Sequence, residues 1–133
     1  MATIDGCLET VESSIGRKIG NTISRIGLDN TKRTNHFAFI TKGSKIISFG
    51  INKYKTHPRA PGKYKQIHAE VDAILNAEYI PEGSVMYSIR ILKNGQYAMA
   101  KPCESCEKYI SRFPIRRVIY TLDEYTFNYM NFD

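Results

Sequence analysis

The chain has 133 residues, a hydrophobic fraction of 42% and a formal net charge of +6 at pH 7. This length predicts a single globular domain over residues 1–133 with a buried core, and no apolar run approaches the roughly 18 residues of a membrane span. The first residues, MATIDGCLETVESSIG, carry acidic side chains and no apolar signal-peptide core, so we expect a cytoplasmic protein that makes no membrane contact.

The positive charge is concentrated in two segments, NKYKTHPRAPGKYK and SRFPIRR. Such clusters favour an anionic partner, either a nucleotide phosphate or a nucleic-acid backbone, although a solvated basic loop gives the same pattern. Two of the three cysteines form a C-x-x-C pair. In a chain without a secretion signal this pair favours metal binding or redox chemistry over a disulfide framework.

The first predicted element is an amphipathic helix over residues 4–26. Apolar residues recur there in steps of three and four, at Ile4, Leu8, Val11, Ile15, Ile19, Ile23 and Ile26. Gly16 and Gly20 weaken this helix and mark either a break or close packing. Residues 36–52, HFAFITKGSKIISFGIN, place two apolar runs around the turn signal TKGSK, which predicts a β-hairpin.

The remaining segments alternate between helices and strands. After the basic loop, residues 68–80 have the composition of a helix that ends before Pro81. We then expect a strand over 84–93, a turn and short extension over 94–100, a short helix over 103–113, a strand over 115–122 and a final strand over 124–132. Helices combined with about five strands favour an α/β fold, a three-layer α/β/α sandwich.

One histidine and two cysteines form a candidate metal site. His68 opens one predicted helix, and Cys103 and Cys106 open another. Zinc binds imidazole nitrogen and thiolate sulfur, and a catalytic zinc site has three protein ligands and a position open to water. These three residues supply that ligand count. A redox C-x-x-C pair is the competing interpretation, but thioredoxin-like pairs usually follow the first strand of a βαβ unit.

Glu70 lies two residues after His68. A zinc ion lowers the pKa of its bound water to about 7, and a nearby carboxylate can take that proton and return it to the substrate and the leaving group. Attack of the hydroxide on a ring carbon that carries an amino group releases ammonia. The residues therefore suit hydrolytic deamination.

The segments HAE at 68–70 and PCESC at 102–106 resemble the H-A-E and P-C-x-x-C motif of the zinc-dependent cytidine and deoxycytidylate deaminase superfamily. The resemblance implies a zinc hydrolase with a cytidine deaminase-like domain around a mixed sheet. His68, Cys103 and Cys106 match the Zn²⁺ ligands, and Glu70 matches the proton shuttle. Members of this superfamily commonly form oligomers, so the resemblance also implies a homo-oligomer.

Further positions match substrate-binding residues of the superfamily. Asn52 resembles the asparagine that contacts the sugar, and Ala69 matches the position whose backbone amide meets the base carbonyl. Tyr120 resembles an aromatic residue that packs near the base, although a core aromatic at a strand end is the competing interpretation. Lys55 and His57 lie in the basic loop and are candidate phosphate contacts.

The chain resembles in particular the deoxycytidylate deaminase branch, including its compact viral members, which implies that dCMP is converted to dUMP. Asp72 departs from this branch, where asparagine is usual. Only 13 residues follow Tyr120, a length that suits a closing antiparallel strand, as in small nucleoside deaminases. His36, at the start of an apolar strand, is interpreted as a structural residue.

Two other functions remain open from the sequence. A polynucleotide deaminase that acts on tRNA or on single-stranded DNA or RNA would use the basic loop and stacking tyrosines. A zinc-binding module without catalytic activity would not need Glu70 and would have a fourth protein ligand.

Overall fold

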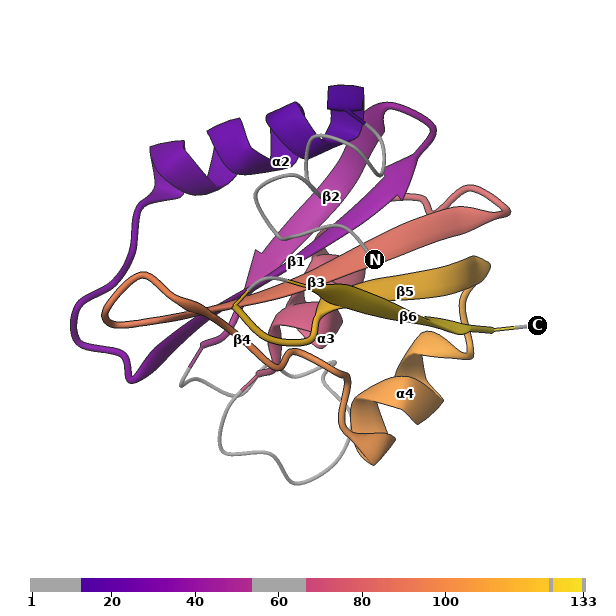
Figure 1. The fold of residues 1–133 in the computed structure, drawn as a ribbon. Helices are drawn as coiled ribbons and strands as arrows, with labels where there is room; N and C mark the ends of the chain where they lie inside the picture. Colours follow the sequence, from indigo (N-terminus) through magenta and orange to yellow (C-terminus); the bar gives the residue numbers. More distant parts are fainter. Residues whose placement is uncertain (1–12, 54–66, 125, 133) are drawn as a thin grey trace.

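The computed structural model describes residues 13–53, 67–124 and 126–132, which form a sheet with helices on both faces (Figure 1). The elements run in the order α2 (Ser13–Ile26), β1 (Thr34–Lys42), β2 (Lys45–Ile51), α3 (Ala69–Asn76), β3 (Ser84–Leu92), β4 (Tyr97–Ala98), α4 (Glu104–Ile110), β5 (Ile115–Thr121) and β6 (Phe127–Asn131). Helix α2 lies on one face of the sheet, and α3 and α4 lie on the other. The predicted α/β class and three layers are confirmed.

The sheet is mixed, with the strand order β2-β1-β3-β5-β6 and β4 paired to β3. Only β3 and β5 run parallel, and the other pairs are antiparallel. The sheet has six strands because the short extension after residue 94 pairs with β3. The final strand is antiparallel to β5, a direction that the sequence left open.

The expected hairpin forms from β1 and β2. Its turn contains Gly43, whose φ of +59° is in the left-handed region that glycine adopts at low cost. The predicted N-terminal helix is present from Ser13 onward, and Ile15 and Ile19 of this helix are fully buried against the sheet. Residues 4–12 of that prediction lie outside the described part of the chain.

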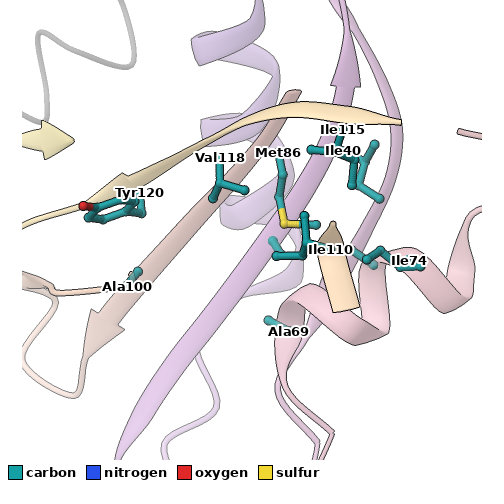
Figure 2. Close-up of a cluster of buried hydrophobic side chains, with 11 residues drawn as sticks. Ile40, Ala69, Ile74, Met86, Ala100, Ile110, Ile115, Val118 and Tyr120 are labelled. Carbon is teal, nitrogen blue, oxygen red and sulfur yellow. The ribbon is translucent and has the colours of Figure 1, made fainter. Parts of the chain in front are cut away.

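Alternate residues of each strand face opposite layers. On β1, Phe37 and Phe39 pack in the layer with α2, whereas Ala38 and Ile40 pack in the layer with α3 and α4. Figure 2 shows the second core, in which Met86 of β3 lies among side chains from β1, β5 and both helices.

Two helices end earlier than the sequence predicted. The helix expected over 68–80 stops at Asn76, because Ala77 adopts extended backbone angles and the chain turns back toward β3. Ile80 nevertheless packs against the core as a non-helical residue. The helix expected over 103–113 stops at Ile110 and is followed by a turn. Among the described residues, no helix is long and apolar enough to cross a bilayer.

Helix α3 packs unusually close to β2 at Gly50. A Cβ atom built on Gly50 would overlap the backbone nitrogen of Ala73 and come within 2.5 Å of the carbonyl oxygen of Ala69. Ser48 reinforces this contact by donating a hydrogen bond of 2.8 Å to the carbonyl oxygen of Ala73. The first turn of α3 is therefore fixed against the sheet by backbone contact.

We expect Gly50→Ala to lower the free energy of unfolding by at least about 1–3 kcal/mol, because the added methyl group must displace the backbone of α3. Urea unfolding followed by circular dichroism measures this change. Gly20→Ala is the matched control: its Cβ has no neighbour within 4 Å, so alanine in this helix should raise stability by roughly 0.5–1 kcal/mol. Equal stability of the Gly50→Ala and wild-type proteins would contradict the packing argument.

Candidate metal centre and adjoining cavity

The starts of two helices bring the predicted metal ligands together. His68 is the N-cap residue of α3 and Cys103 is the N-cap residue of α4, and both have extended backbone angles. Neither side chain caps its own helix with a hydrogen bond. Cys106 lies in the first turn of α4 and is buried. Residues distant in sequence thus meet where the two helices begin.

The ligand atoms are spaced for one metal ion. His68 Nδ1 lies 3.1 Å from Cys106 Sγ and 3.6 Å from Cys103 Sγ, and all three ligand atoms lie within 4.8 Å of one another. Tetrahedral zinc bonds of about 2.0 Å to nitrogen and 2.3 Å to sulfur separate such atoms by roughly 3.6 Å. The set therefore fits zinc, and within the described ranges no fourth histidine, cysteine or carboxylate joins it.

The charge state of the Cys106 thiol depends on whether a cation is bound. Burial raises the pKa of the Cys106 thiol, and the negative charge of Glu70 raises it further. Near neutral pH this thiol would keep its proton in the absence of a metal ion. A bound dication favours the thiolate and reverses this balance.

Glu70 is a buried carboxyl group at the edge of the metal site. It lies in the first turn of α3 with only 1% of its surface exposed. Burial is the main cause of its raised pKa. Its Oε1 atom has no hydrogen-bond partner among the described residues. A buried oxygen without a partner is costly in a folded protein and indicates that a ligand or water completes the site.

His36 lies beside Glu70 but carries no charge to pair with it. Burial, followed by the positive charges of Arg90 and His68, lowers the pKa of His36 to about 3. The imidazole is therefore neutral at physiological pH. Its Nδ1 atom lies 3.7 Å from Glu70 Oε1, a contact that does not count as an ion pair.

A hydrogen-bonded chain sets the tautomer of His36. The Ser88 hydroxyl donates its hydrogen to the carbonyl oxygen of Ala100 at 2.9 Å, so it accepts a hydrogen bond from His36 Nε2 at 2.7 Å. The unprotonated Nδ1 atom of His36 therefore faces Glu70, an arrangement that suits a protonated carboxyl group. Ser88 also links His36 to the segment that leads into Cys103.

A cavity of about 260 Å³ adjoins these groups, close to the lower limit of typical small-molecule sites. All of its described lining residues carry a polar or ionisable side chain: Thr34, His36, Asn52, His68, Glu70, Arg90, Lys101 and Cys103. Such a lining suits a polar, charged ligand.

The other predicted substrate contacts occupy different places. Asn52 lines the cavity, where its side chain accepts a hydrogen bond from the backbone N–H of His36 at 3.1 Å and donates one to the carbonyl oxygen of Thr34 at 3.3 Å. Ala69 is the first residue of α3 and is buried in the core. Tyr120 is 5% exposed, packs in the same core (Figure 2) and is not among the residues that line the cavity. Lys55 and His57 lie outside the described residues.

Three of these lining residues were not predicted from the sequence, and a fourth, His36, was predicted only to be structural. Thr34, Arg90 and Lys101 carry no recognisable motif. A signal for Arg90 was nevertheless present, because a charged residue interrupts the apolar strand SVMYSIRIL at a position that alternates with Met86 and Ser88. It therefore faces the same layer as α3.

Comparisons with known proteins agree with this geometry. Residues 24–122 match the family model described as the cytidine and deoxycytidylate deaminase zinc-binding region. The fold resembles that of the dCMP deaminase from cyanophage S-TIM5. Its apo form has a TM-score of 0.53 at 18% identity over 84% of this chain and 82% of that chain. Its complex with dCMP and dUMP has a TM-score of 0.52 at 19% identity over 77% and 75%. A search of curated protein sequences found no match.

We expect Cys106→Ser to lose most of its bound zinc and to unfold at a lower temperature, because formation of such a site is coupled to folding. Metal analysis by mass spectrometry and thermal unfolding measure the two effects. Glu70→Gln is the matched control within the same cavity, and it should keep the zinc content of the wild-type protein. Unchanged zinc in Cys106→Ser would remove this cysteine from the ligand set.

Proposed function

We propose that this chain, which belongs to the cytidine and deoxycytidylate deaminase zinc-binding family, removes the amino group of a cytosine nucleotide by hydrolysis. The substrate we infer is dCMP, which reacts with water to give dUMP and ammonia. The observation that carries the proposal is the buried Glu70 carboxyl group, which has an unpartnered Oε1 atom and lines the same cavity as His68 and Cys103.

The bound zinc ion would be held by His68, Cys103 and Cys106. It would supply a water molecule acidic enough to lose a proton near neutral pH. In the proposal, Glu70 accepts that proton at Oε1 and passes it to N3 of the cytosine ring. After the hydroxide oxygen has added to C4, Glu70 takes the remaining proton of that oxygen and delivers it to the amino nitrogen. The bond from C4 to this nitrogen then breaks, ammonia leaves and C4 becomes the carbonyl carbon of uracil.

The surroundings of Glu70 favour transfer of a proton to and from its carboxyl group. A carboxyl group in water is too acidic to hold a proton near pH 7, and burial raises the pKa of Glu70 toward the range in which it can act as both base and acid. The neutral His36 beside it adds no positive charge, and the nearby Arg90 lowers the pKa of Glu70 less than burial raises it. The proton can therefore move between Glu70 and the substrate.

A nucleotide substrate is supported by the charge of the cavity and by the resemblance in fold to a protein whose structure contains dCMP and dUMP. Arg90 and Lys101 place two cationic side chains in the cavity lining.

We also propose that the chain assembles into a homo-oligomer and that it is located in the cytoplasm. Sedimentation of the purified protein would test the first, and microscopy of a tagged chain the second.

We expect Glu70→Gln to keep its zinc and to lose about 10²- to 10⁴-fold in turnover, because glutamine cannot carry the proton. Ammonia release from dCMP, deoxycytidine, cytidine, cytosine and short single-stranded DNA and RNA measures the activity. Glu78→Gln is the matched control, since Glu78 is exposed beyond the end of α3. Its turnover should equal that of the wild type.

The same substrates separate the competing functions. Activity on oligonucleotides alone would replace the proposal with a polynucleotide deaminase. Absence of ammonia release from every substrate, with zinc bound, would favour a non-catalytic zinc module. Full activity of Glu70→Gln would exclude Glu70 as the proton carrier.

A further inference from the structure

Arg90 enters the cavity from the sheet itself. On the antiparallel pair of β1 and β3, Arg90 lies directly opposite His36, so the two side chains extend from the same face. Ser88, which hydrogen-bonds to His36, precedes Arg90 by two residues on that face. The face of β1 and β3 that packs against α3 and α4 therefore ends in a row of polar side chains that leads to the cavity.

The guanidinium group of Arg90 lacks an anionic partner in the described part of the protein. Its Nε atom is buried without a hydrogen-bond partner. Arg90 belongs to none of the ion pairs among the described residues, although Glu70 lines the same cavity. Arg90 as a whole is only partly buried and lines the cavity. Its positive charge therefore faces the cavity without an anion from the described residues, so an anionic ligand bound there can pair with it.

Lys101 adds a second positive charge to the same cavity. It is exposed and lies two residues before Cys103 in the segment that joins β4 to α4. This segment is held to the sheet because the N–H of Ala100 donates to the carbonyl oxygen of Thr121 at 2.8 Å and the carbonyl oxygen of Ala100 accepts from Ser88. The residue next to Lys101 is therefore anchored to the strands on either side.

We infer that Arg90, assisted by Lys101, binds the phosphate group of a mononucleotide substrate and so selects dCMP over deoxycytidine. The inference rests on the proposed deamination of a cytosine nucleotide and assigns its phosphate contact to described residues in place of Lys55 and His57. A guanidinium group donates paired hydrogen bonds to phosphate oxygens, and an adjacent ammonium adds charge. A neutral nucleoside would leave Arg90 unpaired.

The size of the cavity favours a mononucleotide over a polynucleotide. A polynucleotide requires an open groove in which many cations follow the backbone. Within the described residues the cavity has about 260 Å³ and contains Arg90 and Lys101 as its cations of fixed charge. That arrangement matches one phosphate group attached to one nucleoside.

The test is binding of dUMP and of deoxyuridine to zinc-loaded protein, measured by titration calorimetry. In the wild type, dUMP should bind more tightly than deoxyuridine. Arg90→Gln should weaken binding of dUMP by about 10- to 100-fold, as expected for loss of a charged hydrogen-bonding group, and should change binding of deoxyuridine less than about twofold. Lys101→Gln, at an exposed position, should weaken binding of dUMP by about threefold for a partly solvated charge.

Arg116→Gln is the matched control. Arg116 is exposed on β5 and lines a separate hollow with Glu82 and Phe132, so the substitution removes the same charge without touching the cavity. Its affinity for dUMP should equal that of the wild type. Zinc content and thermal unfolding of each variant verify the fold, and Lys101→Gln gives an independent reading if Arg90→Gln does not fold.

Three outcomes would overturn the inference. The first is equal loss of affinity for dUMP and deoxyuridine in Arg90→Gln, which would make Arg90 a positioning residue for the base or for Glu70. The second is a loss of affinity for dUMP in Lys55→Gln without any loss in Arg90→Gln or Lys101→Gln. The third is an equal loss of affinity for dUMP and for a short single-stranded DNA in Arg90→Gln. All three outcomes come from binding measurements, so none of them rejects the proposed deamination. Conversely, a wild-type protein that binds dUMP through Arg90 but releases no ammonia from dCMP would reject only the proposed reaction.

Discussion

The site depends on the backbone contact between α3 and β2. Gly50 lets the first turn of α3 lie against the sheet, and the side chain of Asp72 accepts a hydrogen bond of 3.0 Å from the N–H of Ile51 at the end of β2. Asp72 is buried and also pairs with Lys53 at 3.0 Å. These contacts fix both the height and the rotation of α3. His68 and Glu70, at its beginning, are positioned as a result.

Polar side chains at one end of β1 and β3, on the face that packs against α3 and α4, also position the site. Toward the middle of the sheet these strands contribute Ala38, Ile40 and Met86 to the core. At the end near the helix starts, the same side carries His36, Ser88 and Arg90. Burial of Ser88 and His36 is compensated by their mutual hydrogen bond and the contact to Ala100. Glu70 Oε1 and Arg90 Nε are not compensated among the described residues. These two unpaired atoms therefore lower the free energy of unfolding of the unliganded protein at a place where a bound ligand adds contacts.

The parts of this arrangement that the sequence predicted are those with local signals. The hairpin follows from two apolar runs around a glycine turn, and the metal ligands follow from a short motif at two helix starts. The end of α3 was predicted too late, because Ile80 packs against the core without being helical. Helix propensity alone cannot distinguish an apolar residue inside a helix from one that packs against the core in a non-helical segment. His36 and Arg90 were assigned no functional role because pairing of β1 with β3, which brings them together, joins segments more than 50 residues apart.

The distribution of charge in the cavity connects the fold to the proposed choice of substrate. The two thiolates that would hold the zinc ion balance its charge. Among the described lining residues this leaves Glu70 as the one acid, together with the cations Arg90 and Lys101. Glu70 comes from the helix layer and Arg90 from the sheet. The proposed proton carrier and the cation without an ion-pair partner among the described residues are therefore held on separate elements. A substrate with its reactive amino group at one end and an anionic group at the other can satisfy both. A nucleotide has this polarity, whereas a free base or nucleoside satisfies only the Glu70 end.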